Sequence, residues 1–380
     1  MRYRCGTLTV PGHPLALAVQ AYMVPPGTAS KGTIVVHRGG ASASMATPSV
    51  ALLTGGLYDI VALDAHTFAT SDGRQDGAES VMALDALRRA VHSDVLHYFG
   101  LSDGARLGLA YATTFPDKVG RIVLDAIPND DGHVSLVTLE TTLRAFLNEC
   151  AVAGAGGCPL ASLPVGQLPA FLKRVDASPW TTATGDTLQG SVLRRTVARA
   201  MAVPSRWPRL ASTMTKLLRN ESVDIASWRD DVKCPSSSAS AWRDVARLPL
   251  LASHPIACSE RIPPRTMPLA STLYRNRILV LATELDAWAT KATAEDIVRR
   301  LGVTNAALVV RDGYGHGASV SQPSSCVHAL LTAFFTHGTY PSMRRCAVDA
   351  RPFQMQFEVL LDPRVKAMYT VAASVHGHTT

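Results

Sequence analysis

The residues with the clearest chemical potential form a Gly-x-Ser-x-Gly motif over residues 100–104, with Ser102 at its centre. A short apolar run, Val95–Phe99, leads into the motif, and small residues at helical spacing, Ala105–Thr114, follow it. A strand that turns sharply into a helix needs glycines at both positions, because Cβ atoms would collide there. Such a turn raises the serine hydroxyl above the sheet edge. The flanking strand and helix favour this turn over an ordinary loop, so Ser102 is the predicted nucleophile.

A serine hydroxyl is a poor nucleophile at neutral pH and needs a histidine to accept its proton and an acid to orient that histidine. A buried strand over residues 278–286 ends in the carboxylate of Asp286, and the strand Ala306–Val310 leads into a glycine-rich loop that carries His316. Both residues follow predicted strands, at the edge where open α/β sheets bind their ligands. We therefore predict His316 as the base and Asp286 as the acid that orients it.

Each of these two assignments has an alternative. His316 could be a loop histidine at a tight turn, although three neighbouring glycines favour a site. Asp286 could cap the helix that follows it. Glu284 is a rival acid that lies within the predicted strand, and Asp125, at the end of another predicted strand, is a further candidate.

A tetrahedral oxyanion requires two N–H donors. The amide of Asp103, the residue after the nucleophile, is the first, because it would lie at a helix N-terminus. The second should come from the loop after the strand Thr33–His37, where we nominate the amide of Gly40 or Ala41. The alternative for these residues is an ordinary glycine turn.

Composition excludes several classes of function. The chain has 380 residues, 47% of them hydrophobic, and a mean hydropathy of +0.11, so it is globular, and no apolar run approaches the ~20 residues of a membrane span. Its net charge of +7 is scattered, without the basic stripe and aromatics of a nucleic-acid site. The sequence lacks Cys-x-x-Cys and His-Glu-x-x-His, so we expect no metal and no cofactor. No secretion signal is visible, which predicts a cytoplasmic protein unless a signal was removed.

The seven cysteines leave the redox state open. Close spacing makes Cys150–Cys158 and Cys326–Cys346 plausible disulfides, with Cys234–Cys258 a weaker third pair and Cys5 left over. The alternative is a set of buried free thiols, which a cytoplasmic location would require.

The chain predicts an α/β fold with an insertion. Short buried strands alternate with helical patterns up to Asp125 and again after residue 268, which indicates a mostly parallel sheet flanked by helices. Between these parts the sequence is helical, with helices expected at Val134–Ala153, Val165–Val175, Ser191–Met201, Pro208–Arg219 and Ser240–Leu251. We predict a first half of the core over 1–128, a helical cap over 129–268 and the second half of the core over 269–380.

With these parts in place, the chain resembles the tripeptidyl-aminopeptidase and proline-iminopeptidase branch of the α/β-hydrolases. The likeness covers most of the length: it begins at Cys5–Pro11, includes Asp85–Ala90 and Phe115–Arg121, and is most specific at Gly313–Gly317 and Ser321–Val327. The resemblance implies the α/β-hydrolase fold, a helical cap, and Ser102, Asp286 and His316 as a catalytic triad. It also favours paired cysteines.

The departures from that family surround the reaction centre. Its usual Gly-Gly-Pro-Gly is Gly-Gly-Ala-Ser at residues 39–42, and its Asp-x-Arg-Gly-x-Gly-x-Ser has lost the arginine and both glycines at residues 64–71. The segment between Ser71 and Ala78 is also shorter than usual. The residue after the nucleophile, usually aromatic there, is Asp103, whose charge would oppose an oxyanion unless it is paired or points away.

These features predict a serine hydrolase that cleaves an amide or ester through an acyl-enzyme, on either a short peptide or a small-molecule metabolite. An aminopeptidase would bind a free ammonium group through carboxylates of the cap, for which Glu149, Asp244 and Glu260 are candidates, and Trp288 is a further candidate substrate contact. The alternative function is a non-hydrolytic or ligand-binding protein with an altered oxyanion hole. We expect a monomer or a dimer.

Overall fold

The computed structural model describes residues 3–9, 16–38, 48–63, 77–129, 135–164, 166–181, 185, 187–221, 223 and 272–354. In this part of the chain nine strands form one sheet in the order β1-β2-β4-β3-β5-β6-β9-β10-β11. The strands are β1 (Tyr3–Thr9), β2 (Ala16–Tyr22), β3 (Thr33–His37), β4 (Asp59–Leu63), β5 (Leu96–Leu101), β6 (Val119–Asp125), β9 (Ile278–Leu285), β10 (Ala306–Tyr314) and β11 (Arg345–Cys346). The β1–β2 and β2–β4 pairs are antiparallel, and every pair from β4 to β11 is parallel.

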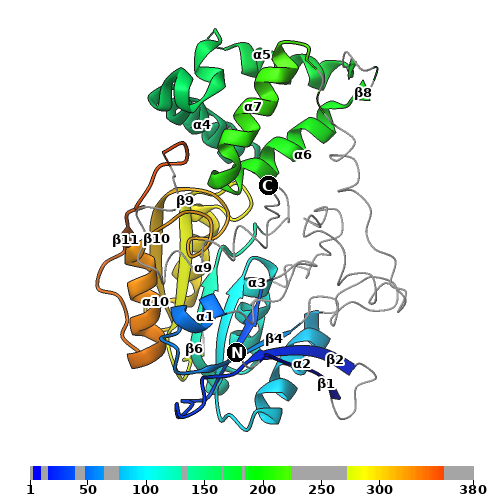
Figure 1. The fold of residues 1–380 in the computed structure, drawn as a ribbon. Helices are drawn as coiled ribbons and strands as arrows, with labels where there is room; N and C mark the ends of the chain where they lie inside the picture. The colour runs from blue at the N-terminus through cyan, green and yellow to red at the C-terminus, as the bar shows by residue number, and fades with distance from the viewer. Residues whose placement is uncertain are drawn as a thin grey trace.

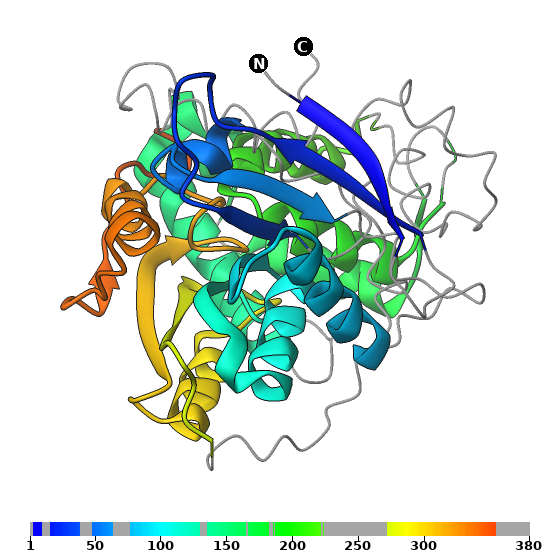
Figure 2. The same cartoon turned by 90° about the horizontal axis from the view of Figure 1, so that it is seen from below.

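Helices cover both faces of this sheet (Figures 1 and 2). They are α1 (Pro48–Leu53), α2 (Gly77–Ala90), α3 (Asp103–Thr114), α9 (Lys291–Leu301) and α10 (Ser325–His337). Successive strand residues point to opposite faces. Val35 and Tyr98 therefore pack with α2, α3 and α9 in one core, whereas Val36 and Phe99 pack with α1 and α10 in a second core.

A block of helices lies in the chain between β6 and β9. It contains α4 (Leu136–Gly157), α5 (Gln167–Ala177), α6 (Gly190–Met201) and α7 (Trp207–Leu218), with the short hairpin β7 (Trp180–Thr181) and β8 (Thr187–Leu188). These helices have their own core, which includes the fully buried Phe146, Trp207 and Met214. Figure 1 shows the block in green at one end of the sheet, and Tyr314 at the end of β10 packs against its core.

This is the α/β-hydrolase architecture, and it confirms the predicted fold class. A mostly parallel sheet with helices on both faces places the carboxyl ends of β3, β5, β9 and β10 at one edge. Strand order reverses around β3, since β4 lies on one side of it and β5 on the other. Ligands bind at such switch points in open α/β sheets.

Several element boundaries differ from the prediction. β10 continues through Tyr314 rather than ending at Val310, because a shift of register after Arg311 still lets Tyr314 pair with Leu285 of β9. Gly313 accommodates this irregularity with a φ of +91°. The strands β1 and β11 and the helix α1 were not predicted. The predicted helix Ser240–Leu251 lies outside the described residues.

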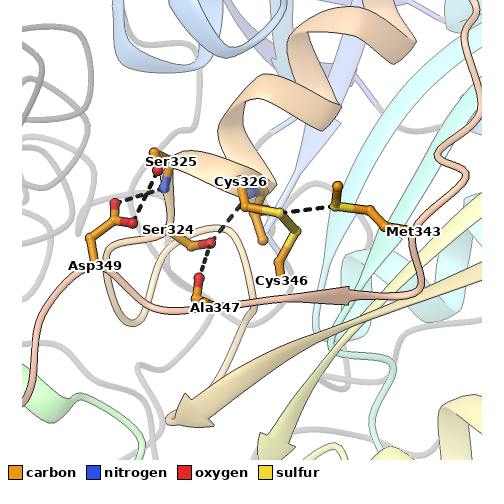
Figure 3. Close-up of a disulfide and its surroundings, with 8 residues drawn as sticks. Ser324, Ser325, Cys326, Met343, Cys346, Ala347 and Asp349 are labelled. Atoms are coloured by element: carbon orange, nitrogen blue, oxygen red, sulfur yellow. Dashed lines mark hydrogen bonds between the residues drawn. A yellow bond between two sulfur atoms is a disulfide. The ribbon is translucent and has the colours of Figure 1, made fainter.

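Two disulfides join described cysteines. Cys150 and Cys158 link the end of α4 to the segment after it, with Cα atoms 5.2 Å apart, and Cys326 and Cys346 link α10 to β11, with Cα atoms 5.5 Å apart. Figure 3 shows the second bridge together with the contacts on either side of it. The alternative of free thiols is therefore wrong for these four residues, whereas Cys5 is a free, exposed thiol. Cys234 and Cys258 lie outside the described residues.

No helix within the described ranges is both long enough and apolar enough to span a membrane.

Candidate active site

Ser102 lies at the sharp turn between β5 and α3. Its backbone has φ 59° and ψ −124°, a left-handed conformation that is uncommon for a non-glycine residue. The glycines on either side are required by close approach of the main chain. A Cβ on Gly100 would lie 2.4 Å from the carbonyl oxygen of Gly104, and a Cβ on Gly104 would lie 2.0 Å from the carbonyl oxygen of His37. The sequence therefore folds locally into a strained strand-to-helix turn with a half-buried serine at its apex.

His316 and Asp286 form a hydrogen-bonded pair. The imidazole Nδ1 lies 2.9 Å from Oδ2 of Asp286. Oδ1 of the same carboxylate accepts the N–H groups of Trp288 and Ala289, at 2.9 and 3.1 Å, so Asp286 also caps its own turn. The side chain of Asp286 is fully buried and that of His316 is 22% exposed. This geometry fixes one ring nitrogen of His316 and leaves Nε2 as the nitrogen for proton transfer.

Asp125, at the end of β6, holds the loop that carries His316. Its two carboxylate oxygens accept the N–H groups of Ala318 and Ser319 at 2.8 and 2.9 Å, and Oδ2 also accepts the Ser319 hydroxyl at 2.5 Å. Its main-chain oxygen accepts the N–H of Ser102 at 2.9 Å. Asp125 therefore joins the two parts of the site.

Glu284, the other alternative acid, lies inside β9. It bonds to Lys291 at 2.6 Å and faces Arg345 at 3.1 Å. These two cations take both of its oxygens, and no hydrogen bond joins it to His316 among the described contacts. Asp286 is the acid that this geometry favours.

The charges around His316 favour its protonated form. Burial lowers the pKa of this imidazole, but the carboxylates of Asp286, Asp125 and Asp103 outweigh burial, and the net effect raises the pKa above 6.5. Asp103 itself lies 3.8 Å from Arg106, one turn along α3. Burial raises the pKa of Asp103, while Arg106 and His316 act in the opposite direction.

The amide of Asp103 is at the N-terminus of α3, where the first N–H groups of a helix have no partner within the helix. Gly40 and Ala41, nominated for the second oxyanion donor, lie outside the described residues. The close contact of the His37 carbonyl with Gly104 shows that β3 ends directly against the turn at Ser102. The loop that follows β3 therefore starts beside the proposed nucleophile.

Arg311 is a structural residue of the site that the sequence analysis missed. Its guanidinium is fully buried and donates to the side chains of Thr283, Ser321 and Gln322, at 3.2, 2.6 and 3.1 Å. It also donates to the main-chain oxygen of Tyr314 at 2.9 Å. Arg311 thus joins both ends of the histidine loop. A lone arginine in an apolar strand was the available signal.

Asn129 has a similar role for the loop after Asp286. Its side-chain oxygen accepts the N–H of Thr290 at 3.1 Å and the hydroxyl of Thr293 at 3.0 Å, and its own N–H donates to the carbonyl of Trp288. Its carbonyl accepts Arg106 at 2.7 Å. Asn129 therefore ties this loop to α3, the helix that begins after Ser102.

The nominated substrate contacts have different surroundings. Trp288 lies in the turn capped by Asp286, and its indole N–H donates to the carbonyl of Ala198 in α6 at 3.4 Å, so it bridges the sheet and the helical block. Glu149 of α4 accepts the hydroxyl of Tyr314 at 3.0 Å and faces Arg351 at 3.8 Å. Because both of its oxygens have protein partners, this geometry does not favour Glu149 as the binding group for a substrate ammonium. Glu260 and Asp244 lie outside the described residues.

No three histidine, cysteine, aspartate or glutamate side chains gather as a metal-binding set among the residues that the structure covers. The side chains available for chemistry at this site are the serine Ser102, the histidine His316 and the buried carboxylate of Asp286.

Comparison with known proteins gives a family match in the C-terminal part of the chain. Residues 249–346, which include Asp286 and His316, match the family model described as TAP-like protein. The match covers less than half of the chain, so it shows that the C-terminal part is similar to this family. The serine protease Hip1 of Mycobacterium tuberculosis is 28% identical over 173 residues, which cover 39% of this chain and 31% of that protein. The tripeptidyl aminopeptidase of Streptomyces lividans is 46% identical over 46 residues, 12% of this chain and 9% of that enzyme. The chain therefore spans less than a third of these relatives' length in the matched parts.

Among solved structures, the proline iminopeptidase of Mycobacterium smegmatis is similar over 82% of this chain and 91% of that chain. The sequence identity is 16% and the TM-score is 0.40.

Proposed function

We propose that this chain is a serine hydrolase that cleaves an amide or ester bond through an acyl-enzyme, with Ser102, His316 and Asp286 as its triad. The observation that carries the proposal is the pairing of a strained serine turn at a helix N-terminus with a buried Asp286–His316 hydrogen bond. Both features lie at the carboxyl edge of one sheet, and Asp125 bonds to the serine turn and to the loop that carries His316. The TAP-like match and the names of the relatives support hydrolysis.

In the proposed reaction, Nε2 of His316 accepts the proton of the Ser102 hydroxyl as the serine oxygen bonds to the substrate carbonyl carbon. The carbonyl oxygen then carries the negative charge, and the amide of Asp103 donates to it. When the tetrahedral centre collapses, His316 gives its proton to the leaving amine or alcohol and the acyl-enzyme remains. Water repeats the sequence, releases the acid and restores the serine. Asp286 keeps the imidazole in the required tautomer throughout.

The helices between β6 and β9 act in this proposal as a cap over the site, within the division 1–128, 129–268 and 269–380 expected from the sequence. Contacts of Trp288 with Ala198 and of Tyr314 with Glu149 support this role, because each joins a segment next to a site residue to a helix of the block. A cap of this kind limits the size of the substrate. We therefore propose a short peptide or a small molecule as the substrate.

The test is covalent labelling with a fluorophosphonate, which reacts only with an activated serine. Wild type, Ser102→Ala and His316→Ala are compared by intact mass, with Ser162→Ala as a control because Ser162 is an exposed serine of the helical block. The proposal predicts one adduct on wild type and on Ser162→Ala, and none on the other two. Panels of free and N-acylated peptides and of small esters then separate an aminopeptidase, which requires a free ammonium group, from an esterase.

If folded wild type forms no adduct, the serine is not activated and hydrolysis through Ser102 is ruled out. A ligand-binding or non-hydrolytic role of the same fold would then take its place.

A further inference from the structure

The loop that carries His316 is bonded to the helical block as well as to the sheet. The N–H of His316 donates to the carbonyl of Ala202, at the end of α6, at 2.8 Å. Gly315 has a φ of +97°, and a Cβ there would lie 2.6 Å from Pro204 and 2.8 Å from the same carbonyl. The main chain of the histidine loop therefore lies directly against the segment between α6 and α7.

Tyr314 makes the side-chain part of this junction. Its ring packs on the indole of Trp207, the first residue of α7, with ring centroids 4.9 Å apart. Its hydroxyl donates to Oε1 of Glu149 in α4 at 3.0 Å. Burial, followed by the bond to Glu149 and its charge, raises the pKa of Tyr314 to about 12. The phenol therefore stays protonated and remains the donor at any pH used for an assay.

Residues 351–354 complete the junction from another direction. Arg351 faces the second oxygen of Glu149 at 3.8 Å, and the side chain of Glu149 is only 13% exposed. Phe353 packs on Phe146 and Trp207, with ring centroids 5.7 and 6.3 Å away. This segment follows Cys346, whose disulfide to Cys326 joins it to α10 (Figure 3). Glu149 is thus held from both sides, which makes it a rigid acceptor for Tyr314.

Glycines precede and follow His316, and both have positive φ, +97° at Gly315 and +91° at Gly317. Glycine gives the main chain more conformational freedom than any other residue, so the loop does not fix the imidazole by itself. Arg311 and Asp125 fix the loop against the sheet. On the side of the loop that faces the helical block, Tyr314 and the main-chain N–H of His316 make the hydrogen bonds to the block.

We infer that Tyr314 and Glu149 are positioning residues for His316, and that the helical block is a part of the catalytic apparatus through their hydrogen bond. The inference rests on the proposed hydrolase function. The bond spans 165 residues of sequence and joins the strand two residues before His316 to the middle of α4. If it is lost, the ring of His316 can move relative to the cap, and small displacements of catalytic groups have large effects on rate.

The experiment compares Tyr314→Phe, Glu149→Leu and Glu149→Gln. Tyr314→Phe keeps the ring on Trp207 and removes only the hydroxyl, whereas Glu149→Leu removes the acceptor. Glu149→Gln keeps an acceptor oxygen for the phenol and should restore the activity that Glu149→Leu loses. The kinetic probe is p-nitrophenyl acetate, and hydrogen exchange of residues 313–321, measured by mass spectrometry, reports the loop without requiring turnover.

Two matched controls are available in the chain. Tyr340→Phe removes a tyrosine hydroxyl that donates to the carbonyl of Arg277, at the amino end of β9 and away from the site. Glu140→Leu removes a carboxylate of the same helix, α4, that pairs with Arg144 on the exposed surface. Neither control should change kcat or the exchange of the histidine loop.

We expect kcat to fall about tenfold or more in Tyr314→Phe and Glu149→Leu, with KM almost unchanged, because both residues act on His316 in this inference and not on the substrate. Exchange of residues 313–321 should rise in the same two variants. Unchanged kcat and exchange in these variants would overturn the inference, as would an equal loss in Glu149→Gln or in the controls. Absence of fluorophosphonate labelling of wild type is a separate result that overturns the proposed function. The exchange measurement then still decides whether the junction holds the loop.

Discussion

The main-chain oxygen of Asp125 accepts the amide hydrogen of Ser102 at 2.9 Å. The carboxylate of Asp125 meanwhile accepts the amides of Ala318 and Ser319, 193 and 194 residues further along the chain. One residue at the end of β6 therefore sets the relative position of the serine turn and the histidine loop. Strand β6 can place Asp125 there because it lies between β5, which leads to Ser102, and β9, which leads to Asp286.

Replacement of this carboxylate should separate the two parts of the site. In Asp125→Asn one of the two acceptor oxygens becomes an NH₂ group that faces an N–H donor in a fully buried position. We expect the free energy of unfolding to fall by about 1–3 kcal/mol, the cost of a buried group without its hydrogen bond, and fluorophosphonate labelling of Ser102 to slow. Urea unfolding and the labelling rate measure the two effects. The exposed Asp94→Asn is the control, and an equal effect in both variants would contradict the role of Asp125.

The turn at Ser102 should not tolerate a Cβ on Gly104. In Gly104→Ala the new methyl group would lie 2.0 Å from the His37 carbonyl oxygen, which is main chain and cannot move aside without shifting β3. We expect a lower thermal midpoint and loss of labelling together. Gly156→Ala is the matched control, because a Cβ there meets nothing within 4 Å and alanine favours a helix. Scanning calorimetry of both variants tests the prediction, which fails if Gly104→Ala is as stable as wild type.

Much of the fold was predictable because local patterns determine it. The alternation of buried strands and helices predicted the observed bounds of β3 and placed β5 and β9 within a few residues of their observed ends. The strand β11 could not be predicted, since its two residues pair with β10 only through contacts distant in sequence. For the same reason the extension of β10 through Gly313 and Tyr314 was predicted as a loop.

The candidate site also has residues that the sequence predicts and residues that it does not. Ser102, Asp286 and His316 could be nominated because glycines and strand ends mark them, and the structure brings the last two into contact. Asn129 and the bond between Tyr314 and Glu149 carry no such local mark, and Arg311 is marked only as a lone arginine in an apolar strand. Their function depends on partners 10 to 165 residues away, which only the folded chain brings together.

The charges near His316 predict a particular pH dependence. The histidine must be neutral to accept the serine proton, so activity is lost as the pH falls through its pKa. Burial lowers that pKa, but the carboxylates of Asp286, Asp125 and Asp103 outweigh burial and raise the pKa above 6.5. The acidic limb of the pH–rate profile should therefore lie above the ordinary pKa of histidine. Asp103→Asn removes one of these charges. The acidic limb of the pH–rate profile should therefore lie at lower pH in this variant than in wild type, and its rate at pH 6, as a fraction of its maximum rate, should be higher.

The labelling rate of Ser102 as a function of pH measures this limb. Asp117→Asn, which changes an exposed carboxylate near the amino end of β6, should leave the limb in place. A limb that is the same in Asp103→Asn and in wild type would show that the Asp103 carboxylate does not act on His316.

The disulfide between Cys326 and Cys346 should contribute strongly to stability. A closed loop with a separation of 20 residues restricts the unfolded chain enough to add about 3 kcal/mol to the free energy of unfolding. The double replacement Cys326→Ser with Cys346→Ser should lower the free energy of unfolding by this amount in urea, whereas replacement of the exposed, unpaired Cys5 by serine should not.

The bridge between Cys326 and Cys346 also holds β11 and the residues after it beside α10, where Asp349 accepts the amide of Ser325 at 2.7 Å (Figure 3). Loss of the bridge should therefore increase hydrogen exchange in residues 345–354 more than in β9. A double variant with wild-type stability and exchange would show that the packing of Phe353 and the bonds of Asp349 hold this segment without the disulfide.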